Sequence, residues 1–356
     1  MKKIVIALFS MFLSIGAYAQ TSIDFGKFQT SFKDFAGSIA SSLPANSTIG
    51  LNWSDAYIGY LPHFGIGLSA GFTTIPGAAV DTLTQNLGLG SLTTALGSSA
   101  ANLINQYGVP LPGYTVDLRL GGLFLPFDVG LKFGYIGDKI SQIQQALPAG
   151  MQLNYLLTGI DVRFQLVKEG FLIPEISVGG GFNYLSGNVG FKVGSGDITL
   201  ANFSVPDPST NYTTNTTYNI TLTQPDLVFA WDSKVFDAKI QVSKHILIFT
   251  PYVGLGASYG ISSAGGGLSS TLLINGSTPT PAEISAIQQG LKYLNNGQTF
   301  DFTSQGILAY AAANGFGARF FGGMSIDLLI LHLDLNAMYD FVGKSYGAGL
   351  NFRIQF

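Results

Sequence analysis

The C-terminal residues 344–356 alternate between apolar and small or polar side chains, and this pattern constrains the fold more than any other feature. Successive side chains of a β-strand point to opposite faces. One face of a strand here carries Tyr346, Ala348, Leu350, Phe352, Ile354 and Phe356. A terminal Phe carboxylate is unfavourable in a soluble core. In a transmembrane barrel, by contrast, such a strand turns its apolar face to lipid and its polar face to a wet lumen.

The stretch resembles the last strand of bacterial outer-membrane β-barrel proteins of the Gram-negative, diderm type. In that class, alternating apolar residues and a final Phe are recognised by the barrel-assembly machinery. The resemblance implies that the partners of the chain are this machinery and outer-membrane lipid. The implied assembly signal consists of Tyr346, Leu350, Phe352, Ile354 and Phe356.

The N-terminus has the pattern of a secretory signal peptide. Lys2 and Lys3 precede an apolar run from Ile4 to Ile15, and Ala17-Tyr18-Ala19 forms a small-x-small cleavage site. The run is too short to span ~30 Å of hydrocarbon. The sequence therefore predicts a signal peptide over 1–19, an N-terminal segment over 20–47 and a barrel over 48–356. The cleaved chain is expected in the outer membrane.

Composition supports a barrel. The chain has 47% hydrophobic and only 10% charged residues, against ~25% charged in ordinary globular proteins. Mean hydropathy is +0.34, yet no stretch after the signal peptide has the ~18 consecutive apolar residues of a membrane helix. The 20 acidic residues outnumber the 17 basic ones, so we expect no nucleic-acid partner. Without cysteine there is no disulfide framework.

Strands recur in pairs closed by short turns, over about 48–75, 113–137, 151–188, 225–261 and 316–341, followed by the single strand 345–356. This pattern predicts an all-β fold, a transmembrane antiparallel barrel of about 12 strands (range 10–14), with short amphipathic helices in the N-terminal segment and the long loops. Short turns and both chain ends are expected in the periplasm. The predicted lumen-facing polar residues are Asp117, Arg119, Lys132, Asp161, Arg163, Gln165, Asp237, Lys239, Gln241, His332, Asp334, Asn336 and Arg353.

Eleven predicted strands conflict with the even number usual in bacterial barrels. Residues 20–47 could supply a twelfth strand, lie as a helix on the periplasmic membrane surface, or form a plug helix inside the barrel. A further alternative makes 302–312 a strand turned at Asn314-Gly315, but Ala311 to Ala313 before Asn-Gly suggests a helix end. The plug hypothesis is based on a helical stripe over 27–43. It contains Phe28, Phe32, Phe35, Ile39 and Leu43.

Enzymatic and metal sites have little support in the sequence. His63 and His245 lie in short turns, where a solvated side chain is expected, and His332 with Asp334 supplies too few ligands for a metal. No Ser-His-Asp set is readable, so we predict no enzyme, although an outer-membrane hydrolase stays open. We expect no cofactor and no metal. Residues 189–224, rich in Asn and Thr, are interpreted as a hydrogen-bonding surface loop.

Two classes of function remain. The first is a passive channel or transporter for small or hydrophobic solutes, which resembles in architecture the outer-membrane fatty-acid transporters with their N-terminal plug. The second is a structural or adhesin-like surface-interaction barrel. A solute-sized passage or a gap in the wall favours transport, whereas a lumen filled by side chains and helix favours surface interaction.

Overall fold

A computed structural model describes residues 25–59, 63–79, 82, 98–122, 125–137, 151–192, 196–294, 301–304 and 306–356. The predicted signal peptide lies outside these residues. Within them, no helix is both long and apolar enough to cross a membrane.

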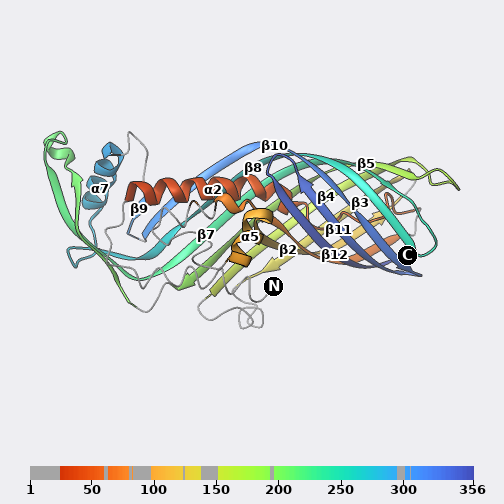
Figure 1. Ribbon diagram of the computed structural model, residues 1–356, viewed down its shortest axis with the longest axis horizontal. Coiled ribbons are helices and arrows are strands. Elements are labelled where there is room, and N and C mark those ends of the chain that lie inside the picture. Colours follow the sequence, from red (N-terminus) through yellow and green to blue (C-terminus); the bar gives the residue numbers. More distant parts are fainter. Residues whose placement is uncertain are drawn as a thin grey trace.

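Ten antiparallel strands close into a barrel, and the sequence-based prediction of an all-β barrel is confirmed (Figure 1). They follow one another around the barrel in chain order, and the last pairs with the first. Two further strands, β6 (Ile198–Pro206) and β9 (Asp301–Thr303), pair outside the closed part. The ten are β1 (Phe64–Ile75), β2 (Val109–Gly121), β3 (Phe127–Ile136), β4 (Met151–Val167), β5 (Glu175–Lys192), β7 (Asn215–Ser243), β8 (Phe249–Ile274), β10 (Gly306–Leu328), β11 (Leu331–Asp340) and β12 (Ser345–Gln355).

The predicted strand over 48–61 is wrong, and this error produced the odd count. Strand β1 is already paired on one edge with β12 and on the other with β2. No edge is left for another strand beside it. Residues 48–59 instead run through the barrel interior, where wall side chains satisfy their backbone. The closed barrel has ten strands, which is the lower limit of the predicted range of 10–14, and the number is even.

Within the closed part of the barrel, the two faces of the strands differ as expected for a barrel in lipid. On β2, Val116, Leu118 and Leu120 are exposed on the outer face, while Asp117 and Arg119 are fully buried on the inner face. On β12, Tyr346, Leu350, Phe352 and Phe356 are 43–51% exposed. An apolar exterior over a charged interior reverses the arrangement of a soluble β-protein.

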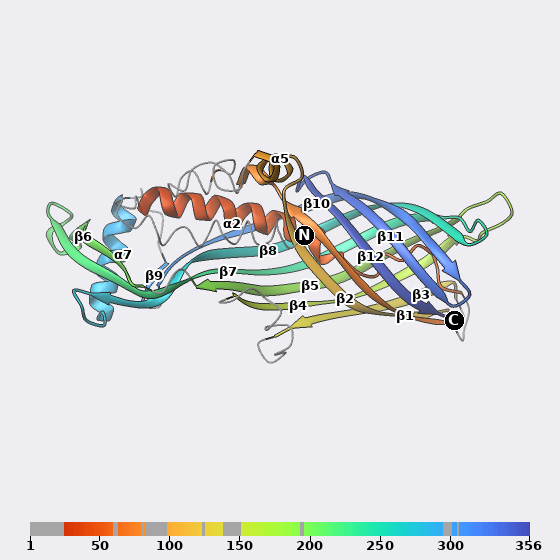
Figure 2. The same cartoon turned by 60° about the horizontal axis from the view of Figure 1, so that its bottom comes forward.

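The two ends of the barrel are unequal. At the end that we call the short-turn end, brief turns join β2–β3, β4–β5, β7–β8 and β10–β11, and Phe356 ends the chain there (Figure 2). At the opposite, long-loop end, β4, β5, β7, β8 and β10 continue beyond the closed part as an open curved sheet, which we call the extended wall (Figure 2). Strand β7 alone has 29 residues.

Two local predictions about this region are wrong. Residues Ala311 to Gly315 are neither a helix end nor a turn, because they pair with β8 inside the continuous strand β10. Residues 189–224 are not a plain loop, because they contain the end of β5, the strand β6, the short helix η2 (Pro208–Thr210) and the start of β7. Pairing of β6 with β7 supplies the hydrogen bonds that the sequence pattern assigned to a loop.

Helix α2 (Phe25–Ser47) lies against the inner face of the extended wall, in contact with β7, β8 and β10 (Figure 1). Phe32 stacks on Phe229 at 5.9 Å between ring centroids, and Phe35 meets the same ring edge-on at 5.6 Å. Ile39 and Leu43 are buried in the same apolar cluster. The first residue of the helix, Phe25, lies toward the long-loop end, opposite Phe356 (Figure 1).

Two further helices lie at the long-loop end. Helix α5 (Ser98–Tyr107) follows β1 and precedes β2 in the chain. Helix α7 (Pro281–Leu294) packs against β6. Thr280 and Glu283 form a capping box at the start of α7, with the Thr280 N–H donating to Glu283 Oε2 at 2.8 Å and the Glu283 N–H donating to Thr280 Oγ1 at 3.3 Å.

Candidate functional site

Residues 48–59, which we call the plug segment, occupy the half of the barrel interior nearer the short-turn end, which we call the short-turn half. Nearly all of its residues are buried, and Trp53, Ser54, Ala56 and Ile58 have no exposed surface. It continues α2 down the lumen toward the short turns and then joins β1. Because it is neither helix nor strand, its backbone needs partners from the wall.

Cationic and amide side chains of the wall donate hydrogen bonds to carbonyls of the plug segment and to that of Ser47, the last residue of α2. They come from several strands around the lumen, so the segment is held from different sides. The contacts are Lys132 Nζ to Ser47 O (2.5 Å) and Ile49 O (2.8 Å), Arg119 Nη2 to Leu51 O (3.1 Å), Lys239 Nζ to Leu51 O (3.0 Å), Gln241 Nε2 to Trp53 O (2.7 Å) and Ser54 O (2.9 Å), and Arg163 Nη1 to Asp55 O (2.6 Å).

Wall oxygens accept from the plug N–H groups. The Ile58 N–H donates to Asp128 Oδ2 at 3.0 Å, and the Ala56 N–H donates to Ser243 Oγ at 3.0 Å. The Leu51 N–H donates to Asp117 at 3.4 Å. Donors and acceptors of the wall thus match the polarity of the backbone that passes them.

The same wall charges pair with one another. Asp128 bonds to both Arg119 and Arg163, the latter at 2.7 Å. Asp161 bonds to Arg119 at 2.8 Å and to Lys239 at 2.9 Å. These groups are almost completely buried, so each charge depends on its partners. A cavity of about 10 Å³ beside Lys132, Asp161 and Lys239 has room for about one water molecule.

Trp53 fills the centre of the plugged region. Two guanidinium groups lie over its ring, with Arg353 Cζ at 5.0 Å and Arg119 Cζ at 5.6 Å from the ring centroid. A Cβ atom on Gly65 would lie 2.5 Å from the Trp53 ring. Glycine on the inner face of β1 is therefore required for this ring to fit.

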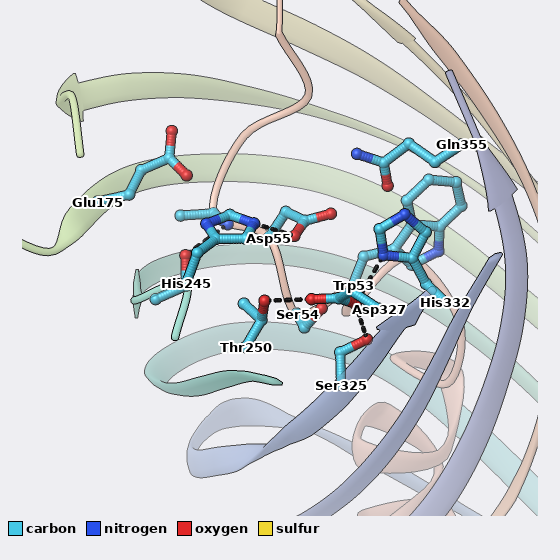
Figure 3. A network of polar contacts seen from close by, with 12 residues as sticks. Trp53, Ser54, Asp55, Glu175, His245, Thr250, Ser325, Asp327, His332 and Gln355 are labelled. Atoms are coloured by element: carbon cyan, nitrogen blue, oxygen red, sulfur yellow. Dashed lines mark hydrogen bonds and ion pairs between the residues drawn. The ribbon is translucent and has the colours of Figure 1, made fainter. Parts of the chain in front are cut away.

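A second set of contacts fastens the plug at the short-turn end (Figure 3). Asp55 bonds to Arg353 at 2.8 Å and lies 3.3 Å from Nε2 of His245. The other ring nitrogen of His245 lies 2.6 Å from Glu169. The contact with Asp55, helped by the hydrogen bond with Glu169, raises the pKa of His245 to about 9. His245 thus joins the plug to the β4–β5 turn, although the sequence suggested a solvated side chain.

The structure places all the sequence-predicted polar residues on the inner face. Most of them take part in the contacts described above. Of the others, Asp237 bonds to Arg319 at 3.3 Å, a residue that was not in the predicted set, and Gln165 bonds to Glu175. His332 and Asp334 do not converge on one point, because His332 contacts Asp327 at 2.7 Å while Asp334 bonds to Arg353. Within the described ranges, no group of three or more acidic or histidine side chains is arranged to hold a metal ion.

Sequence reasoning missed Trp53, Asp55 and Glu169. The sequence offered one sign that this segment is not a strand. In Leu51-Asn-Trp-Ser-Asp-Ala-Tyr the polar and apolar residues do not alternate with a period of two. The helix α2 includes the predicted stripe, and Phe32, Phe35, Ile39 and Leu43 are buried. Phe28 belongs to the helix, but its side chain lies outside what the structure describes.

Each histidine is bonded to an oxygen that cannot act as a serine-type nucleophile. His63 Nδ1 lies 2.7 Å from the Phe356 carbonyl oxygen, and the other two histidines contact carboxylates. Ser325 and Thr250 both donate to Asp327 rather than to His332. The arrangement joins segments to one another and presents no Ser-His dyad in these bonds.

The solved structures that are similar to this chain include bacterial outer-membrane proteins. No family model and no curated protein sequence matches the chain. The outer-membrane protease OmpT of Escherichia coli is 7% identical, with a TM-score of 0.37 over 85% of this chain and 100% of that one. Neisserial surface protein A is 8% identical, with a TM-score of 0.25 over 82% of this chain and 97% of that one. The transport unit of the Escherichia coli autotransporter AIDA-I is 10% identical, with a TM-score of 0.29 over 91% of this chain and 100% of that one.

Proposed function

We propose that this chain, a β-barrel of the bacterial outer-membrane type, is a closed barrel that displays the extended wall and helices α2 and α7 at the cell surface for interaction with other molecules. The observation that carries this proposal is the plug segment, whose backbone bonds to the wall on several sides of the lumen. The alternative is the channel for small or hydrophobic solutes indicated by the sequence.

Energetics favour the closed form. Leaving a buried donor or acceptor without a partner costs about 1–3 kcal/mol. Moving the plug breaks its bonds to the wall, and until water enters the lumen the buried ends of Lys132, Lys239 and Gln241 and the plug carbonyls they bind are without partners. The sum is comparable with the whole stability of an ordinary domain, about 5–15 kcal/mol. Spontaneous opening is therefore expected to be rare.

The extended wall supplies the surface for interaction. A tilted transmembrane strand needs about 9–11 residues. Strands β7, β8 and β10 have 29, 26 and 23 residues, so more than half of each projects beyond the hydrocarbon. Short turns usually face the periplasm in outer-membrane barrels. The extended wall then faces outward.

Conductance of the intact protein in a planar bilayer tests the proposal. We expect no steady ion current. A sustained current from correctly folded protein would overturn the closed barrel and favour a channel. Orientation is tested separately: proteinase K added to intact cells should cut within 196–224, and cleavage only after permeabilisation would place the extended wall in the periplasm.

A gated carrier of hydrophobic solutes is a second candidate, because α2 covers an apolar inner wall that a hydrophobic molecule could occupy if the helix moved. A Cβ on Gly37 would lie 3.8 Å from Cβ of Ala311, the mean distance for a disulfide. The double variant Gly37→Cys/Ala311→Cys should lock α2 to β10. Uptake of a fluorescent fatty acid that stops on oxidation and returns on reduction would establish the gate. Equal uptake in both states would exclude one that uses α2; Gly37→Cys alone is the control.

A further inference from the structure

A shallow groove of about 530 Å³ crosses the outer face of the extended wall. Its lining combines small residues such as Ser186 and Ser263 with the larger Leu156, and Tyr135 on β3 and Tyr310 on β10 lie on the first and last of the strands that it crosses. Asp232 contributes the one carboxylate of its lining. The ends are five strand spacings apart, or about 24 Å, so the groove is long and shallow.

Register places the groove on the outside of the sheet. Ser186, Asp232 and Ser263 lie directly opposite one another on β5, β7 and β8. Their chain neighbours Leu185, Trp231 and Ala264 are buried in the apolar cluster beneath α2. Because side chains alternate along a strand, the groove residues face away from that cluster.

The groove lies just beyond the membrane belt. Phe182, Phe236, Tyr259 and Phe316 form one row across four neighbouring strands, as aromatic residues do at a membrane surface. The groove row is four residues further along each strand, about 13 Å at 3.3 Å per residue, or about 10 Å along the membrane normal at a 40° tilt. The headgroup layer on each side of a bilayer is about 5–8 Å thick.

The lining chemistry suits a sugar. Tyr310 is 51% exposed, and its ring covers Gly265, where a Cβ atom would collide with the ring, so the ring lies flat on the sheet. Flat aromatic faces attract the C–H face of a sugar ring, while Asp232, Asn154 and Asn188 offer acceptors and donors to hydroxyl groups. An acyl chain would instead require an apolar floor at the level of the hydrocarbon.

We propose that this groove binds the saccharide headgroup of a membrane lipid in the leaflet at the long-loop end. The lipid source follows from position, because the groove lies only about 10 Å above the aromatic row that borders the hydrocarbon. A bound headgroup there would fix the height and tilt of the extended wall relative to the membrane. This inference does not depend on whether the lumen opens.

Native mass spectrometry of the full-length protein released from nanodiscs tests the proposal. Nanodiscs contain phosphatidylcholine with or without digalactosyl diacylglycerol, a lipid with a neutral disaccharide headgroup. We expect the glycolipid to be retained selectively. Tyr310→Ala and Asp232→Asn should each weaken retention on the order of tenfold, Tyr310→Phe should restore it, and Tyr293→Ala and Asp226→Asn should leave it unchanged.

Equal retention of phosphatidylcholine, or unchanged retention in both groove variants, would overturn the site. Binding of the free disaccharide as tight as that of the glycolipid would overturn the lipid source. A shift in gel mobility on heating establishes that each variant is folded, and both substitutions lie on an exposed face outside the closed barrel.

Discussion

The two halves of the interior are built from the same strands but hold different occupants. At the short-turn half, β4 and β7 turn Arg163, Asp161, Lys239 and Gln241 inward, onto the plug segment. Higher on the same inner faces, the residues are Leu157, Tyr155, Trp231 and Phe229, which form the apolar cluster with α2. The change coincides with the end of the helix.

Backbone hydrogen bonding explains the difference. A helix satisfies its own N–H and C=O groups, so a helix inside a barrel presents side chains and needs an apolar wall. An extended segment presents unpaired backbone groups, so it needs donors and acceptors from the wall. The inner face therefore changes character where α2 ends at Ser47.

The charged half should be the more sensitive to truncation. Arg119→Ala removes the partner of Asp128 and Asp161 and one donor to the plug, and breaking a buried ion pair costs about 3–5 kcal/mol. We expect a loss of that size in the free energy of unfolding, measured in urea by the heat-dependent gel shift. Asp34→Ala, on the exposed side of α2, is the control. A loss below 1 kcal/mol would mean that water replaces the arginine.

The apolar half should respond locally. Leu43→Ala removes a fully buried side chain between helix and wall, for which about 2–5 kcal/mol is typical. Because α2 is attached to a barrel that closes without it, we expect the loss to appear as faster proteolysis of α2, with the barrel still resistant. Ser41→Ala is the matched control. If the whole barrel unfolds together with α2, the two halves form one cooperative unit.

The outer and inner faces of the closed barrel provide a sharper comparison. Leu118→Arg places a charge in lipid and should cost about 2–4 kcal/mol near the midplane. Gln165→Arg places the same charge on the partly exposed inner side and should cost much less. The two unfolding curves are compared in the same lipid. Equal losses would contradict the assignment of the faces.

Sequence periodicity was sufficient for most strands of the closed barrel and for their faces, because alternation depends on local geometry alone. It identified Asp161, Arg163 and Lys239 as inward residues. It failed for residues 48–59, because no local rule reports that a segment without a strand partner will be bonded by side chains from β2, β3, β4 and β7. The distribution of apolar residues on inner faces at the long-loop half depends on α2, and the sequence alone did not show which strands meet that helix.

The smallest expected effect on the free energy of unfolding concerns the contacts of His245 with Asp55 and Glu169. Its pKa is about 9 in the folded protein and about 6.5 unfolded, so the folded state holds its proton more tightly. The stabilisation is complete below pH 6.5 and disappears as the pH rises through 9. Because the ring is 46% exposed, we expect about 0.2–1 kcal/mol, the range of exposed ion pairs.

His245→Gln isolates this contribution, since Asp55, Glu169 and Lys244 remain. The free energy of unfolding of the unchanged protein should fall more steeply between pH 6.5 and 9.5 than that of the variant, and the two should converge near pH 10. Parallel curves over this range would show that the imidazolium does not hold the plug. In that case Arg353, which bonds to the Asp55 carboxylate at 2.8 Å, holds this side chain without help from His245, and the short-turn end loses this dependence on pH.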